Sequence, residues 1–155
     1  MSHLHTYATT VTWTGNLGTG TSGYRAYDRA HELTADGPAP IAGSSDPAFR
    51  GDPARWNPEQ LLLGALSQCH LLSYLHVCAV AGVVVTAYAD HATGTMTQTA
   101  TGGHFTEATL RPHVTVASPD MVEAAVRLHE DAQKACFIAS SVNFPVHHEP
   151  TVEVG

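Results

Sequence analysis

Apolar and polar residues alternate along the early part of the chain, which is the pattern of strands that turn one face to a core. Residues 3–14, rich in Thr, Val, Tyr and Trp, alternate in this way, and residues 24–33 do so again after a glycine-rich turn at 15–20. Residues 38–42 fit a short third strand, and the loop over 44–55 contains several Pro and Gly residues. The pattern therefore predicts three strands before the first helix.

A long apolar helix is predicted after this loop, and its first residues are suited to cap it. An N-cap, a proline at the first helical position and a capping-box partner occur in order: Asn57, Pro58 and Gln60. Trp56 and Leu61 are spaced to form a hydrophobic staple over the same turn. The helix is expected to run to Ala81 and to stop at Gly82. Because leucines and valines cover nearly all its faces, it must be buried all round, and a second copy of the chain is the simplest cover.

Further strands and a second helix are predicted in the rest of the chain. The expected strands cover residues 83–89, 93–99, 104–115 and 146–154. Ser118-Pro119 begins the second helix, which ends near residues 136–140. The order β-β-β-α-β-β-β-α-β, with short turns, predicts an α+β fold of mostly antiparallel sheets around two central buried helices. We expect one domain over residues 1–155.

The charge and hydropathy of the chain disfavour two classes of partner. The chain carries 14 acidic and 7 basic residues, a net charge of -7, without a block of like charge. Nucleic acids and anionic membrane surfaces require a clustered basic surface, which these few dispersed cations do not form. The apolar run over 61–85 is interrupted by Gln68, His70, Ser73 and His76, which favours a core helix over a membrane span. We therefore expect neither a nucleic-acid partner nor a membrane partner.

The number of cysteines indicates the cellular compartment of the protein. The chain has three: Cys69, Cys78 and Cys136. The N-terminus lacks the basic and apolar segments of a signal peptide, and an odd, sparse set of cysteines is not a secreted disulfide framework. We expect a cytoplasmic protein whose thiols stay reduced or cycle. Cys78 is expected to pack in the core. Eleven histidines occur without a C-x-x-C or H-E-x-x-H spacing, so no metal site is expected.

Cys69, in the middle of the first predicted helix, has two interpretations. Its neighbours are apolar, and burial alone raises the pKa of a thiol and makes it an inert packing residue. A nucleophilic Cys69 needs a cation close by, and arginine is suited because it binds a carboxylate and a thiolate together. Glu59 is the candidate carboxylate, but it lies roughly 15 Å away along the helix axis, so a long arginine must bridge the two. Cys136, at the end of the second helix, fits a thiol that condenses with an oxidised Cys69 and equally fits a packing residue.

Two motifs resemble those of one protein family. Residues 57–62, Asn-Pro-Glu-Gln-Leu-Leu, with Cys69 ten residues after Glu59, resemble the central motif of the OsmC/Ohr family. The family is named for osmotically induced protein C and the organic hydroperoxide resistance protein. Residues 135–142, Ala-Cys-Phe-Ile-Ala-Ser-Ser-Val, resemble its second-cysteine motif. The order of predicted elements also matches, so the resemblance covers nearly the whole chain.

The resemblance implies a fold, an assembly and an activity. Members of the family are intertwined homodimers with two active sites at the subunit interface. They are thiol peroxidases that reduce organic hydroperoxides, and in some cases hydrogen peroxide, without a metal or haem cofactor. Carried over, Cys69 is the nucleophile, Cys136 the resolving cysteine and Glu59 the acidic partner. An external dithiol or lipoyl-type reductant restores both thiols, and an apolar pocket around Leu62 and Leu66 is expected to favour alkyl peroxides.

The arginine has two candidate positions. Arg25, with Arg29 nearby, matches the position used in one branch of the family. Arg50 matches the position used in the other, and we favour it because its loop leads into the Cys69 helix. Residues 27–31 and 45–52 resemble the OsmC-like branch more than Ohr itself. A second function on the same fold therefore stays open: a stress-associated binding protein with little or no peroxidase turnover.

Overall fold

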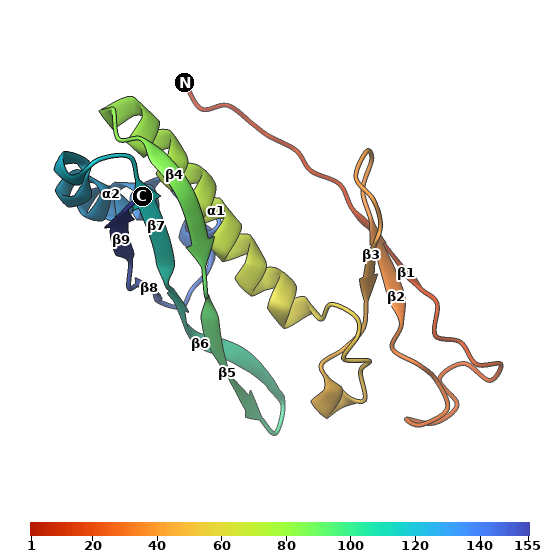
Figure 1. Ribbon diagram of the computed structural model, residues 1–155. Coiled ribbons are helices and arrows are strands. Elements are labelled where there is room, and N and C mark those ends of the chain that lie inside the picture. The colour runs from red at the N-terminus through yellow and green to blue at the C-terminus, as the bar shows by residue number, and fades with distance from the viewer. The chain divides into compact units, whose positions relative to one another are not determined.

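Three three-stranded sheets and two α-helices form the protein, and its computed structural model describes residues 1–155 (Figure 1). Contacts divide the chain into an N-terminal unit, Met1–Leu61, and a C-terminal unit, Leu62–Gly155. The α+β class expected from the sequence is confirmed. The expectation of one domain over 1–155 stays a prediction.

The sheet of the N-terminal unit is antiparallel, and its strands are shorter than predicted. It consists of β1 (Thr10–Trp13), β2 (His31–Thr34) and β3 (Ile41–Gly43), in that order. Residues 3–9 are exposed and lie outside the sheet, so the first predicted strand forms only at its end.

Residues 24–30 leave the second predicted strand because a side chain competes for their backbone groups. Arg29 donates to the carbonyls of Tyr24 and Tyr27, both at 2.7 Å. Its guanidinium also lies over both rings, 4.5 and 4.0 Å from their centroids. The segment is curled by these contacts, and strand pairing begins only at His31.

Helix α1 (Pro58–Ala81) begins and ends where the sequence predicts. The Gln60 amide donates to Asn57 Oδ1 at 2.8 Å, and the Asn57 amide donates back to Gln60 Oε1 at 3.1 Å, so the capping box is formed. At the other end Gly82 has a φ of 75°, the left-handed conformation with which helices commonly stop.

Two mixed sheets belong to the C-terminal unit. One contains β4 (Val85–Asp90), β7 (Pro112–Val116) and β9 (Thr151–Val154), in that order. The other contains β5 (Thr93–Thr99), β6 (Gly102–Leu110) and β8 (Val146–His148), in that order. The pairs β4/β7 and β5/β6 are antiparallel, whereas β6/β8 and β7/β9 are parallel. Pairing in the whole protein is therefore mostly antiparallel, as predicted.

Two predicted strands are each divided between these two sheets. Residues 104–115 separate into β6 and β7 at Arg111, whose amide donates to Asp90 Oδ1 at 2.6 Å instead of continuing a ladder. Residues 146–154 separate into β8 and β9 around Pro150, which has no amide hydrogen to donate. The prediction of single strands over these two ranges was wrong for this reason.

Helix α2 (Val122–Ala135) follows a 3-10 turn, Pro119–Met121, at the predicted start. Its buried residues lie at the predicted helical spacing: Ala125, His129 and Ala132. Cys136 is the C-cap residue and has extended backbone, and the chain then turns as far as Ser141. The second cysteine thus lies where the helix gives way to a turn.

One face of α1 is buried in the core of the C-terminal unit. Its buried residues are spaced about one turn apart: Leu66, His70, Tyr74 and Cys78. Other apolar residues of the helix are exposed within the single chain, among them Leu72 (64%) and Val80 (77%). By length and composition alone α1 could cross a membrane, as could core helices of soluble proteins. The all-round burial predicted for this helix is not provided by the chain itself.

Candidate functional site

Helices α1 and α2 bring two cysteines together. Cys69 lies in the middle of α1, and Cys136 ends α2. Both are free thiols, and the Cys69 side chain is close enough to Cys136 to raise its pKa. Condensation of two sulfurs into a disulfide requires such proximity.

The turn after α2 holds the sulfur of Cys136. This residue is 2% exposed, whereas Cys69 is partly exposed. The Ala139 amide donates to Cys136 Sγ at 3.5 Å, and the Ile138 amide donates to the same sulfur. Ser140 fixes the turn, because its amide and its hydroxyl donate to the Cys136 carbonyl at 3.1 and 3.0 Å.

Burial raises the pKa of the Cys136 thiol to about 11. The amide hydrogen bonds from Ala139 and Ile138 oppose this rise in the pKa, because they stabilise the thiolate. The neighbouring Cys69 thiol adds to the rise through its hydrogen bond and its charge. At neutral pH Cys136 is therefore held as a neutral thiol beside Cys69.

The apolar pocket expected around Leu62 and Leu66 stays a prediction, and Leu66 itself is buried within the chain. Leu66 is 1% exposed and packs in the core against β6 and β8, because that face of α1 covers the sheet. Two other apolar side chains are adjacent in sequence to the cysteines and exposed. Leu72 lies one turn after Cys69 and is 64% exposed, and Phe137 directly follows Cys136 and is 79% exposed.

Glu59, in the first turn of α1, has a buried carboxylate oxygen, Oε2, without a hydrogen-bond partner. Such an oxygen is costly unless a donor or a cation meets it. Arg25 and Arg50 have exposed side chains that make no hydrogen bond or ion pair within the N-terminal unit. Arg29 is already bound to the carbonyls of its own loop. The pairing of Glu59 with an arginine stays a prediction.

A buried group of imidazoles is the feature that sequence reasoning missed. His70 of α1 and His129 of α2 are 0% and 3% exposed, and a hydrogen bond of 3.0 Å joins His70 Nε2 to His129 Nδ1. His148 of β8 packs on His70 with ring centroids 4.3 Å apart, and Tyr74 stacks on His129 at 3.9 Å. The sequence does contain a signal for this group, because His70 lies one helical turn before Tyr74 and His129 lies on the apolar face of α2.

Burial keeps these imidazoles neutral. It lowers the pKa of His70 to about 3 and that of His129 to about 4, and the charge of His148 lowers both further. The pKa of His148 is lowered too, mainly by burial. The three side chains do not have the geometry of a metal site. They act as packing groups that fill the space between α1 and α2.

Ser67 ties the helix turn that carries Cys69 to the edge of a sheet. Its hydroxyl donates to Asp90 Oδ2 at 2.5 Å, and Asp90 Oδ1 accepts the Arg111 amide at 2.6 Å. The same carboxylate thus anchors α1, the end of β4 and the start of β7. This contact limits movement of α1 close to its cysteine.

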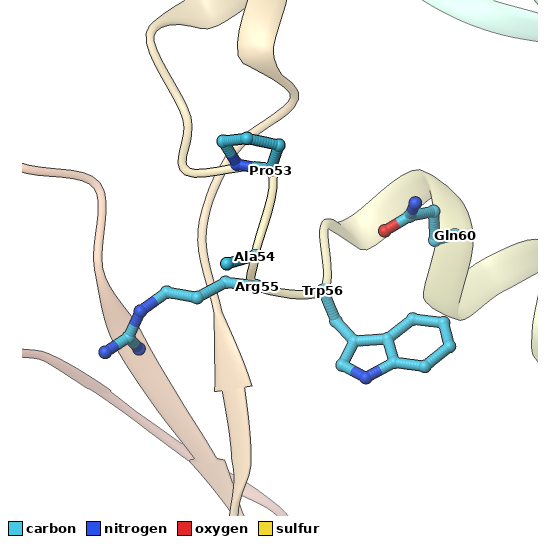
Figure 2. Close-up of a pocket in the computed structure, with 5 residues that line it drawn as sticks. All are labelled: Pro53, Ala54, Arg55, Trp56 and Gln60. Carbon is cyan, nitrogen blue, oxygen red and sulfur yellow. The ribbon is translucent and has the colours of Figure 1, made fainter.

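A shallow pocket of about 220 Å³ lies in the N-terminal unit at the start of α1 (Figure 2). Trp56 lies beside Gln60 and is 56% exposed, so the predicted staple with Leu61 buries little of its ring. Arg55 extends away from the indole and donates to the His31 carbonyl at 3.3 Å. None of the predicted site residues lines this pocket.

The family model for OsmC-like protein matches residues 51–151. The match covers the larger part of the chain and includes Glu59, Cys69 and Cys136. The chain belongs to the OsmC-like protein family. Arg25 and Arg50 lie outside the residues matched to the OsmC-like model.

Solved structures of OsmC-like proteins have the same fold. An OsmC-like protein of unknown function from Vibrio cholerae is 30% identical, with a TM-score of 0.85, over 96% of this chain and 100% of that one. An organic hydroperoxide resistance protein from Elizabethkingia anophelis is 19% identical, with a TM-score of 0.71, over 100% of both chains. One from Legionella pneumophila is 17% identical, with a TM-score of 0.66, over 98% of this chain and 99% of that one. A search of the curated proteins finds no match.

Proposed function

We propose that the protein is a thiol-dependent peroxidase that reduces organic hydroperoxides, with Cys69 as the nucleophile and Cys136 as the resolving cysteine. The observation that carries the proposal is the closeness of these two thiols, which come from different helices and of which Cys69 raises the pKa of Cys136. Relatives of the same fold include organic hydroperoxide resistance proteins. The proposal brings their activity to this chain because both thiols lie in the segment that matches the family.

The reaction begins with attack of the Cys69 thiolate on the distal oxygen of the hydroperoxide. An S–O bond forms, the O–O bond breaks, and the leaving alkoxide takes a proton and departs as the alcohol. Cys69 is then a sulfenic acid. Cys136 Sγ attacks the Cys69 sulfur, hydroxide leaves and becomes water, and a disulfide joins α1 to α2. An external dithiol supplies two electrons and two protons and restores both thiols.

A cation is needed beside the Cys69 thiolate, and Glu59 supports an arginine in that role. Its buried, unpartnered oxygen is the place where a guanidinium would be held. Arg50 and Arg25 have free guanidinium groups within their unit, whereas Arg29 is bound to Tyr24 and Tyr27. We propose Arg50 first and Arg25 second.

The proposed enzyme acts as a cytoplasmic homodimer that needs no metal or other bound cofactor. The exposed apolar residues of α1 and the segment after it support a dimer: Leu72, Leu75, Val80 and Val84. A second copy is the simplest cover for such a face. Sedimentation at low micromolar concentration should give about twice the 16.4 kDa chain mass. A well-folded monomer under those conditions would contradict the dimer.

The second candidate is a stress-associated binding protein with little turnover. The raised pKa of Cys136 favours it, because a thiol that stays protonated resolves a sulfenic acid slowly. Consumption of cumene hydroperoxide and hydrogen peroxide, each with a dithiol reductant in excess, distinguishes the two functions. The peroxidase should turn over many times and should favour cumene hydroperoxide. Less than one equivalent of peroxide consumed per thiol pair would favour the binding protein.

A further inference from the structure

The two sulfurs of the thiol pair differ in access. Cys69 is partly exposed. Cys136 is 2% exposed, and the turn after α2 directs the amides of Ile138 and Ala139 at its sulfur. A disulfide between them would present one sulfur to solvent and keep the other against the backbone.

We propose that the dithiol that reduces the Cys69–Cys136 disulfide attacks Cys69 Sγ and expels Cys136 as the leaving thiolate. This inference rests on the proposed function, which supplies the disulfide. In the first step a bond forms between the reductant sulfur and Cys69, and the Cys69–Cys136 bond breaks with its electron pair on Cys136. In the second step the other thiolate of the reductant attacks its own sulfur in the mixed disulfide and releases the Cys69 thiolate. The dithiol is oxidised by two electrons, and its two protons end on the two protein sulfurs.

Access favours this direction of attack. Exchange requires the incoming thiolate to approach along the S–S axis, opposite the leaving sulfur. Cys136 is almost fully buried, whereas Cys69 is partly exposed, so an incoming thiolate reaches Cys69 more easily. Burial raises the pKa of Cys136 and by itself makes it the poorer leaving group, but the amides of Ile138 and Ala139 oppose that effect because they stabilise the negative charge that develops on Cys136 Sγ.

The dithiol reductant that the family resemblance implies is consistent with this direction of attack. A dithiol completes the second step within one mixed disulfide, so the Cys136 thiolate has little time to attack Cys69 again. A monothiol stops at the adduct and loses it to Cys136, which remains in contact with Cys69. A small dithiol should therefore be much more effective than a monothiol of the same thiol pKa.

The attacked sulfur can be identified without a peroxide. The disulfide is made with the thiol oxidant diamide in a Cys78→Ala background, so that no third thiol complicates the map. It is exposed briefly to glutathione, quenched with acid, alkylated with N-ethylmaleimide, digested and analysed by mass spectrometry. Glutathione should be found on Cys69 in about tenfold excess over Cys136, with the maleimide on Cys136. An equal distribution, or an adduct mainly on Cys136, overturns the proposal.

A pair of serine variants tests the role of the turn. Ser140→Ala removes a hydrogen bond to the Cys136 carbonyl, whereas Ser141→Ala removes one to the Phe137 carbonyl, on the same turn. Reduction of the disulfide by dithiothreitol should slow roughly three- to tenfold in Ser140→Ala, the pKa of Cys136 should rise, and Ser141→Ala should match the parent. Equal rates and equal pKa values in both variants contradict a role for this turn in receiving the leaving thiolate.

The two ideas can fail separately. A glutathione adduct on Cys69 together with no turnover of peroxide would contradict the proposed peroxidase activity but support the proposed direction of reduction. Normal turnover of peroxide together with a glutathione adduct on Cys136 would contradict only the proposed direction of reduction.

Discussion

The same two helices carry the proposed reactive pair and a group of packed imidazoles, and the two differ in burial. At the thiol pair, Cys69 is partly exposed, while Cys136 receives amide hydrogen bonds from a turn. At the imidazole group, His70 and His129 are both buried and hydrogen-bonded to each other. The proposed reaction needs one sulfur that the peroxide can reach and a second sulfur that is protected from solvent. Burial of both members, in contrast, turns titratable groups into neutral packing residues.

The largest expected effect is loss of activity when the accessible thiol is removed. Cys69→Ser should lower peroxide consumption by more than about 100-fold while circular dichroism stays unchanged, because only the nucleophile is lost. Cys78→Ser is the matched control on the same helix and should keep activity, since Cys78 packs in the core. Normal activity in Cys69→Ser would remove the basis of the comparison.

The protected thiol should control the pH dependence of resolution. Because its pKa is raised to about 11, the Cys136 thiolate fraction should increase about tenfold per pH unit across the neutral and mildly alkaline range. Disulfide formation after a single equivalent of peroxide should follow that increase, with no plateau below about pH 10. Stopped-flow mixing with acid quench measures it. A plateau near pH 8.5 would mean that the sulfur behaves as an ordinary exposed thiol.

Replacement within the imidazole group should act on stability rather than on chemistry. His129→Ala should lower the free energy of unfolding by about 2–4 kcal/mol, because it leaves a cavity under Tyr74 and removes the partner of His70 Nε2. Urea titration measures the loss. The rate of peroxide reduction per folded molecule should stay within about twofold of the parent. A large fall in that rate with little change in stability would give the imidazoles a chemical role.

The smallest effect is a dependence of stability on acid. The folded pKa values of His70 and His129 are about 3 and 4, below the ordinary value of 6.5, so the unfolded chain binds more protons in the interval between. Their contribution is fully present above pH 6.5 and is lost as the pH falls towards 4, by about 1.4 kcal/mol per pH unit for each histidine at most. Urea titrations at several pH values measure the slope.

A pair of histidine variants assigns this slope. His129→Gln should reduce it, whereas His76→Gln should not, because His76 is exposed on the same helix as His70. Equal slopes in both variants would show that other groups cause the loss of stability in acid.

Local signals in the sequence were enough to predict the two helices. Asn57 and Gln60 predicted the start of α1 because a capping box involves residues three apart, and both of its hydrogen bonds are formed. Gly82 predicted the end of α1 for a similar reason, because the left-handed backbone conformation that stops a helix depends on a single residue. Cys69 and Cys136 were singled out by motifs on the two helices, although their contact could not be deduced from spacing.

Strand boundaries depended on competing side-chain contacts, one within a loop and one between residues far apart in the chain. The second predicted strand began too early because Arg29 binds the carbonyls of its own loop. The strand over 104–115 was divided because the Arg111 amide pairs with Asp90. Neither of these hydrogen bonds can be recognised from the alternation of apolar and polar residues in the sequence.

The sequence by itself determined the two helices and the caps of α1, because each depends on neighbours within a few residues. Only the tertiary structure decided which thiol is accessible and which histidines are neutral. Exposure and pKa depend on what packs against a side chain, and in this protein the packing residues come from α1, α2 and β8. The sequence could therefore propose a thiol pair, and the fold made its two members unequal.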